Sequence, residues 1–246
     1  MIIAIVNQKG GTAKTTTTVN LGKALALRGK RVLLVDADPQ GSLSYSLGVI
    51  QPEKTIADLL YNDAPFEEVM VSKEGMDIIP SDVSLADAEL VLVDSENRET
   101  HLRELLAPIS QYDVILIDCP PSLSLLTVNA LTAADKVIVP MLMEVLSLQG
   151  LDLISETIDK IGNTLNEGLE VLGILPVMVD TRRKLSYEVF DHISQNYDFR
   201  IFETRIRPNV RASEAPSFGQ SVVSYAPDSN SAKDYVELGD ELLKLI

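Results

Sequence analysis

A glycine-containing loop near the start of the chain holds residue types that bind phosphate. Residues 2–18 read IIAIVNQKGGTAKTTTT, so an apolar run ends at Asn7 and a helical pattern begins at Lys14. Where a strand leads into a helix N-terminus, loop N–H groups point inward and the helix dipole favours negative charge, which makes a cradle for a phosphate chain. In such a loop Lys14 reaches the terminal phosphates, and the hydroxyl of Thr15 is a ligand for Mg²⁺. The loop residues expected to bind phosphate are Gly10, Gly11, Thr12, Ala13, Lys14, Thr15 and Thr16.

This loop departs from two common phosphate-binding motifs. It lacks G-x-G-x-x-G, and Ala13 stands before Lys14 where the ordinary G-x-x-x-x-G-K-T loop has glycine. If the backbone at Ala13 is left-handed, its Cβ costs about 1–2 kcal/mol, so we expect a slightly reshaped loop and slower hydrolysis. The alternative interpretation is a simple turn at residues 10–11 with Lys9 in solvent. That alternative does not explain why Lys14 and two threonines stand at the start of the helix.

Two further apolar runs end in carboxylates. Residues 32–40 read VLLVDADPQ and end with Asp36 and Asp38, and residues 113–122 read DVILIDCPPS and contain Asp118. Ligands bind at the carboxyl ends of parallel strands in open α/β sheets. Asp118 has the position of the second metal-binding carboxylate of P-loop ATPases, which holds Mg²⁺ usually through water. Cap formation explains one aspartate at a strand end more readily than a pair.

The hydrophobic pattern predicts a scaffold that brings these strand ends together. Short runs rich in valine, isoleucine and leucine alternate with helical stretches, as in a parallel sheet that is buried on both faces. We therefore expect a doubly wound α/β fold with a mostly parallel sheet, helices on both faces and a single domain over residues 1–246. The predicted strands are 2–6, 31–36, 77–80, 113–118, 136–140 and 171–179. The predicted helices are 14–28, 98–109, 124–133, 147–165, 185–196 and 231–245.

Composition excludes several other classes of protein. No apolar run approaches the roughly 20 residues of a membrane span, and the start MIIAIVNQKGG lacks the basic region of a signal peptide. The single cysteine, Cys119, forms no internal disulfide, so we expect a cytoplasmic protein and assign this thiol no chemistry. The formal net charge of −15 argues against a surface coated in positive charge. Residues 180–211 nevertheless hold seven basic and five acidic residues, which allows a locally basic face.

Several segments resemble, in family order, the deviant Walker A ATPases of the ParA/MinD group, and within it the Soj-like ParA proteins. They are KGGTAKTT at 9–16, DADPQGS at 36–42, DCPPSLSLLTVNAL at 118–131 and NVRASEAPSFG at 209–219. The resemblance covers nearly the whole chain. It implies a P-loop NTPase fold and a slow, switch-like ATPase that uses ATP and Mg²⁺ and closes into a face-to-face homodimer.

The resemblance also implies roles for individual residues. Lys9 and Lys14 act in catalysis, Lys9 by reaching the phosphates of the partner subunit's nucleotide. Asp38 orients the attacking water and joins Thr15 and Asp118 at the metal. Pro208 and Asn209 match the stretch that holds adenine. The family order there is Pro-Arg-Asn and this chain has Arg-Pro-Asn at 207–209, which leaves the base contact of Pro208 open.

Interaction partners follow from the same resemblance. Soj-like proteins contact DNA without sequence preference through arginines that match Arg182 and Arg211. The expected function is therefore a partitioning or positioning ATPase whose ATP-bound dimer holds double-stranded DNA on the nucleoid. An adaptor protein would trigger hydrolysis, and the cargo is a plasmid, a chromosome or a protein assembly such as a carboxysome. The sequence does not select among these cargoes.

Two alternatives remain. A MinD-like membrane ATPase ends in a basic amphipathic helix, whereas residues 232–246 carry two lysines and four acidic residues and would be repelled by anionic lipid. We therefore expect no membrane binding. A small-molecule ligase or kinase on the same scaffold would need a second substrate pocket, and no further set of polar residues announces one.

Overall fold

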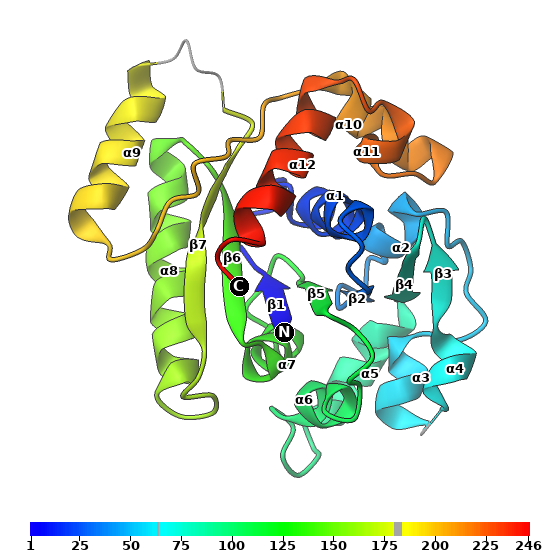
Figure 1. Ribbon diagram of the computed structural model, residues 1–246. Coiled ribbons are helices and arrows are strands. Elements are labelled where there is room, and N and C mark those ends of the chain that lie inside the picture. The colour runs from blue at the N-terminus through cyan, green and yellow to red at the C-terminus, as the bar shows by residue number, and fades with distance from the viewer. Residues whose placement is uncertain (63, 180–183) are drawn as a thin grey trace.

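A mostly parallel, seven-stranded sheet forms the centre of the molecule (Figure 1). The structure is a computed structural model that describes residues 1–62, 64–179 and 184–246. The strand order is β3-β4-β2-β5-β1-β6-β7, and only the β3–β4 pair is antiparallel. The predicted fold class is confirmed. The strands are β1 (Ile2–Ile5), β2 (Val32–Asp36), β3 (Val71–Lys73), β4 (Met76–Ile79), β5 (Val114–Asp118), β6 (Lys136–Leu142) and β7 (Glu170–Val177).

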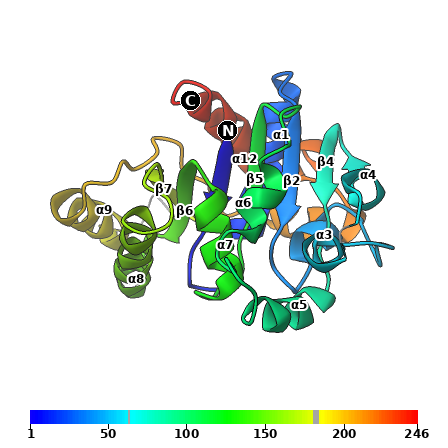
Figure 2. The same cartoon turned by 90° about the horizontal axis from the view of Figure 1, so that it is seen from below.

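Helices cover both faces of this sheet (Figure 2). Alternate residues of a strand point to opposite faces, so Ala4 belongs to one hydrophobic core and Ile3 and Ile5 belong to the other. The core that contains Ile3 and Ile5 includes residues of α1, α2, α11 and α12, and the core that contains Ala4 includes residues of α3 to α9. The helices are α1 (Lys14–Leu27), α2 (Ser42–Ser46), α3 (Ile56–Tyr61), α4 (Phe66–Val69), α5 (Ser84–Leu92), α6 (His101–Leu106), α7 (Leu125–Ala133), α8 (Val145–Gly162), α9 (Lys184–Asn196), α10 (Val210–Glu214), the 3₁₀ helix η1 (Ala215–Phe218), α11 (Val222–Tyr225) and α12 (Asn230–Leu242).

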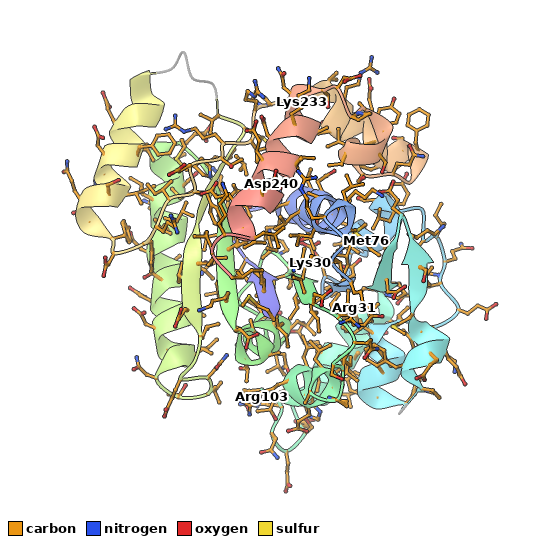
Figure 3. All side chains as sticks on the ribbon, in the orientation of Figure 1. Lys30, Arg31, Met76, Arg103, Lys233 and Asp240 are labelled. Carbon is orange, nitrogen blue, oxygen red and sulfur yellow. The ribbon has the colours of Figure 1, made fainter. Side chains whose placement is uncertain are left out.

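The last helix, α12, packs its apolar face against α1. Tyr235, Leu238 and Leu242 are fully buried, and a Cβ at Gly239 would lie 3.0 Å from the Cβ of Ala24. The polar side of the helix stays outside, where Lys233 and Asp240 are labelled in Figure 3. Arg28, at the end of α1, forms an ion pair with Asp240 at 2.6 Å. The apolar stripe of α12 is thus part of the core.

The central strands are buried on both faces as the pattern predicts, and their register fixes the site. Every residue of β2 and of β5 is buried. In the pairing of these strands Asp36 lies beside Asp118, and Ile5 of β1 lies beside Asp118 on the other side. The predicted carboxylates therefore meet at one edge of the sheet, directly beside the loop that follows β1.

Residues 40–95 contain elements that the hydrophobic pattern did not predict. β3 has three residues, of which none is buried, so no apolar run announces it. It turns into β4 through Glu74 and Gly75, which have φ of 54° and 81°. The short helices α2 to α5 were also missed, although Thr55 and Asp58 form a readable capping box at the start of α3.

Several predicted boundaries were also wrong. The predicted helix 98–109 is shorter, because α6 spans only His101–Leu106. The predicted strand 171–179 is shifted, since β7 begins at Glu170 and ends at Val177. The predicted strand 77–80 starts one residue late, because Met76 already pairs with Lys73 of β3. Pattern-based boundaries differ from the structure by a few residues, as is usual at element ends.

Candidate nucleotide-binding site

The loop between β1 and α1 is held in place by Asn7 at its base. The Nδ2 of Asn7 donates to the carbonyl of Pro140 at 2.7 Å, and its Oδ1 accepts from the N–H of Lys9 at 2.9 Å. Farther along, the hydroxyl of Thr12 donates to the carbonyl of Lys9 at 3.1 Å. These bonds curl residues 7–13 back over the end of the sheet, and Gly11 supplies a left-handed turn with φ of 74°.

Ala13 has the left-handed backbone that glycine usually provides. Its φ is 59° and its ψ is 28°, and its carbonyl accepts the N–H of Thr17 at 2.8 Å. It is therefore the N-cap residue of α1. Ala13 therefore has the backbone conformation in which a Cβ is expected to cost about 1–2 kcal/mol.

The loop presents N–H donors and one ammonium group toward open space. Among the described residues, no hydrogen-bond acceptor lies on the N–H groups of residues 10–16. The Lys14 side chain is only 7% exposed, and its Nζ donates to the carbonyl of Lys9 at 3.4 Å. Burial lowers the pKa of the Lys14 ammonium, while the Asp118 carboxylate opposes that shift. Free amides and a partly desolvated cation at a helix N-terminus suit a phosphate anion.

Asp118 lies under the loop at the end of β5 and accepts from two threonines of α1. Its Oδ2 accepts from the Thr15 hydroxyl at 2.7 Å, and its Oδ1 accepts from the Thr18 hydroxyl at 3.2 Å. Burial raises the pKa of Asp118 to about 8, the neighbouring Asp36 carboxylate adds to that shift, and the bond from Thr15 opposes it. A hydroxyl and a carboxylate are the oxygen ligands that Mg²⁺ prefers. Within the described ranges, no cluster of three or more His, Cys, Asp or Glu offers another metal site.

Asp38 lines a cavity together with residues of the loop between β1 and α1. Its Oδ1 accepts from the N–H of Gln40 at 2.9 Å and its carbonyl accepts from the N–H of Gly41 at 2.9 Å. The cavity has a volume of about 370 Å³. Asp36 does not line it, because its carboxyl is completely buried against Ser44. The residues that line this cavity are Gly10, Gly11, Thr12, Ala13, Lys14, Thr15, Thr16, Asp38, Ser42, Ser46, Pro121 and Met178.

Lys9 points away from the cavity of its own chain. Its Nζ forms an ion pair with Oε2 of Glu144 at 3.6 Å, and the Lys9 side chain is 37% exposed. Glu144 is the N-cap residue of α8. Lys9 is absent from the cavity lining, and so is the completely buried Asp118.

A second cavity of about 420 Å³ adjoins the first and shares Ala13, Thr16 and Met178 with it. Its lining includes the predicted residues Pro208 and Asn209. Asn209 also caps α10, since its Oδ1 accepts from the N–H of Arg211 at 2.9 Å. The remaining lining residues are Val177, Ile206, Arg207, Val210, Ala212, Ser213, Pro216 and Tyr235.

Sequence reasoning missed part of this second cavity. Tyr235 comes from α12, which was considered only as a possible membrane helix, and its hydroxyl lies 3.4 Å from that of Thr17. Met178 follows β7 with φ of 52° and has no motif around it. Arg207 is tied to the buried carboxylate of Asp234, so the inverted Arg-Pro order has a structural role. Only the EAPSFG segment at 214–219 gave a readable sequence signal here.

Arg211, one of the two predicted DNA-contacting residues, lies in α10 between Val210 and Ala212, which line the second cavity. Arg211 is 54% exposed at its side chain and pairs with Glu214 at 2.7 Å. Arg205 stacks over the ring of Phe190 at 4.5 Å from its centroid. Arg182, the other predicted contact, lies outside the described residues.

The chain is similar in sequence to known proteins over nearly its whole length. A family model described as an AAA domain matches residues 1–171. The chain is 44% identical to the sporulation initiation inhibitor protein Soj of Bacillus subtilis, with 98% of this chain and 97% of that protein covered. It is 43% identical to the chromosome partitioning protein ParA of Myxococcus xanthus, covering 99% of this chain and 88% of that protein.

A solved structure of similar shape supports the same grouping. The crystal structure described as cobyrinic acid a,c-diamide synthase from Mycobacterium smegmatis, with bound ADP and magnesium, superposes with a TM-score of 0.87. It is 36% identical in sequence, and the match covers 99% of this chain and 94% of that chain.

Proposed function

Because the chain belongs to the Soj/ParA family of P-loop ATPases, we propose that it is an ATP-driven switch for partitioning or positioning cargo. In this proposal the chain binds ATP with Mg²⁺ and pairs with a second copy. The pair holds double-stranded DNA without reading its sequence, and an adaptor protein triggers hydrolysis and release. Residues 1–246 act together as one ATPase domain that is associated with the nucleoid.

The observation that most supports nucleotide binding is the pair of adjoining cavities. The polar one ends at Lys14 and Asp38, and the more apolar one is closed by Pro208 and Tyr235. A nucleoside triphosphate has the same division, with charged phosphates at one end and a flat, largely apolar base at the other. Free loop amides, a buried ammonium and the Thr15–Asp118 oxygen pair fit a triphosphate with its metal.

The proposed roles follow from where each group lies. Lys14 and the N–H groups of residues 10–16 hold the phosphates, and Thr15 and Asp118 hold Mg²⁺, with Asp38 close to the same ion. When bound, Mg²⁺ supplies positive charge to the phosphate oxygens. Asp38 orients the attacking water. Such a site works by positioning and charge stabilisation, which suits a slow switch.

Pairing of two copies is supported by the surface at the carboxyl ends of the central strands. Several large apolar side chains there are exposed, among them Tyr45 at 56%, Leu123 at 42% and Leu146 at 71%. Each follows the carboxyl end of a central strand, so they share the edge of the sheet with the cavity. A second copy placed against this edge would cover them and bring its Lys9 to the first copy's phosphates.

Binding to DNA is supported less directly. Arg211 is exposed beside the second cavity, and its dimer mate would double the number of phosphate contacts. Membrane binding has less support, because the apolar side of α12 is packed on α1. Among the described residues, no helix is long and apolar enough to cross a membrane.

One experiment tests the switch against its alternatives. ATP hydrolysis is measured with plasmid DNA, with anionic vesicles and with neither, while light scattering follows the molecular mass. The switch predicts an ATP-dependent doubling of mass, DNA binding and a DNA-dependent hydrolysis rate. Vesicle co-sedimentation with ATP would instead support a MinD-like positioner. Hydrolysis that appears only with a small acceptor such as cobyrinic acid would support a ligase of the kind named for the mycobacterial structure.

A further inference from the structure

The loop that carries Asp38 is tied down at both ends by one buried carboxyl group. Asp36 has no exposed surface, and its Oδ2 accepts from the N–H of Ser44 at 2.9 Å and from the Ser44 hydroxyl at 2.7 Å. Its Oδ1 accepts from the N–H of Asp38 at 3.3 Å. Residues 37–43 therefore form a closed loop whose first and last turns are bonded to the same side chain.

Ser44 extends this connection to a third segment. Its hydroxyl, while donating to Asp36, also accepts from the N–H of Ser81 at 3.0 Å. Ser81 follows β4, which neighbours β2 in the sheet. The loop approaches this segment so closely that a Cβ on Gly41 would lie 2.7 Å from the carbonyl oxygen of Ser81. The end of β2, the start of α2 and the segment after β4 thus meet at Ser44.

Asp36 is placed to hold this loop rather than to bind metal. Neither Asp36 nor Asp118 lines the phosphate cavity, but Asp118 accepts from the Thr15 hydroxyl, a second oxygen ligand for a metal. Asp36 instead accepts from Ser44 and from the N–H of Asp38. Its Oδ2 is occupied by two hydrogen bonds, and both donors belong to the residue that anchors α2. Burying a carboxyl group is unfavourable unless it is well bonded, so a merely structural turn has little need for one at this position.

We propose, on the premise that the chain hydrolyses ATP as proposed above, that Asp36 is a positioning residue for hydrolysis. Acting through Ser44, it holds residues 37–43 so that Asp38 faces the phosphate cavity. A displacement of a catalytic group by about 1 Å can cost about 10²-fold in rate. Loss of the Ser44 hydroxyl should therefore lower kcat while the loop amides and Lys14 still bind nucleotide.

Three variants test this role, at two serines that are buried to nearly the same extent. Ser44→Ala removes the hydroxyl that joins Asp36 to Ser81. Ser81→Ala is the control, because Ser81 is 2% exposed and Ser44 1%, and the bond to Ser44 comes from the backbone of Ser81. Ser44→Thr keeps the hydroxyl. We expect kcat of Ser44→Ala to fall by about 10- to 100-fold with KM for ATP nearly unchanged, Ser81→Ala to match the wild type, and Ser44→Thr to recover most of the missing rate.

Hydrogen exchange of the amides in residues 37–44 gives a second measurement that does not depend on turnover. Exchange should be about tenfold faster in Ser44→Ala and unchanged in Ser81→Ala. Equal reductions of kcat in the two alanine variants, or a raised KM with normal kcat in Ser44→Ala, would overturn the positioning role. If the wild type hydrolyses no ATP, the proposed function fails, and unchanged exchange in Ser44→Ala would separately overturn the anchoring of the loop.

Discussion

The cavity lined by Lys14 and Asp38 and the exposed surface around Arg211 differ in how far their charged groups are removed from water. At the cavity, Lys14 is 7% exposed and Asp38 is 9% exposed, and Asp118 beside it is completely buried. Each has a specific hydrogen-bond partner in the loop, in α1 or in its own turn. At the surface, Arg211 is 54% exposed and forms an ion pair with Glu214, three residues away on the same short helix.

Because of this difference, a buried charged residue says more about its own function than an exposed one does. Burying a charged group costs several kcal/mol unless it is paired, so a buried lysine beside buried carboxylates needs an explanation such as a ligand. An exposed arginine keeps its hydration and gains little from a surface ion pair, so its presence needs no such explanation. Mutations should therefore have large effects in the cavity and graded effects on the surface.

Lys9 should give the largest effect, because it is exposed in the single chain and becomes buried only in the proposed pair. Charge supplied by a partner subunit at phosphoryl transfer is worth about 10³-fold or more, so we expect Lys9→Ala to hydrolyse ATP about 10³-fold more slowly. Lys54→Ala is the matched control, since Lys54 is 38% exposed in an ion pair with Glu68, close to the 37% of Lys9. Lys54→Ala should turn over normally.

Mixing variants tests whether Lys9 acts across the pair. In a mixed dimer of Lys9→Ala with Asp38→Ala, one of the two sites has an intact Asp38 and receives an intact Lys9 from its partner. An equimolar mixture should recover about a quarter of the wild-type rate if subunits exchange freely. Failure of the mixture to exceed the two variants measured alone would contradict a role in trans.

Asp38→Ala should give the next largest effect, with kcat lower by about 10²-fold and ATP binding retained. The carboxylate lines the cavity from the loop after β2, so its removal takes away the group that orients water but leaves the phosphate donors of the loop before α1 in place. Light scattering with ATP and Mg²⁺ should show a persistent dimer. A variant that fails to bind ATP would show that Asp38 mainly holds the metal or the fold.

Arg211→Glu should have a smaller and salt-dependent effect. Affinity for two unrelated DNA duplexes should fall equally, and the slope of log affinity against log salt should flatten by about 0.9 for each DNA phosphate that the variant no longer neutralises. Arg28→Glu is the control, because Arg28 also lies in an exposed ion pair but on the α1–α12 surface. ATP hydrolysis without DNA should be unaffected. Affinity equal to that of the wild type would show that Arg211 does not touch DNA.

The smallest expected effect is a pH dependence of stability. The pKa of Asp118 is raised from about 4 to about 8, so the folded chain binds a proton more tightly than the unfolded chain does. This contribution to the free energy of unfolding is fully present below about pH 4 and is lost as the pH rises toward about 8. Without nucleotide, stability should fall across this window by about 1–3 kcal/mol more in the wild type than in Asp118→Asn.

Thermal unfolding of the two proteins across a pH series measures that difference, and subtracting one from the other removes the general effect of the net charge. Mg²⁺ with ATP should reduce the pH dependence, because a cation favours the charged carboxylate. A wild-type stability that rises with pH relative to the variant would contradict the raised pKa.

Much of the phosphate site was predictable because its residues are close together in sequence. The segment from Ile2 to Thr18 contains the strand, the loop and the helix start, and local spacing alone predicts where Lys14 and Thr15 lie. The strand ends at Asp36 and Asp118 were predictable as well, since a continuous apolar run ends at each. Periodicity is a local property, and these features are local.

Tertiary structure alone decided how distant segments combine. The register of β2 and β5 places Asp36 beside Asp118, and only in the folded chain does Ser44 bond to Asp36 and Ser81. The second cavity joins residues after β7, residues near 208 and Tyr235 of α12, which no local pattern connects.

The same limit explains the elements that were missed. β3 and the short helices between residues 40 and 95 owe their shape to contacts and single caps rather than to a repeating apolar pattern. The sequence by itself determined the glycine-containing loop before α1, the aspartates at the ends of β2 and β5, and the alternation of strands and helices. Tertiary structure decided the neighbours of each buried polar group, because those neighbours are set by packing between segments that are far apart in the chain.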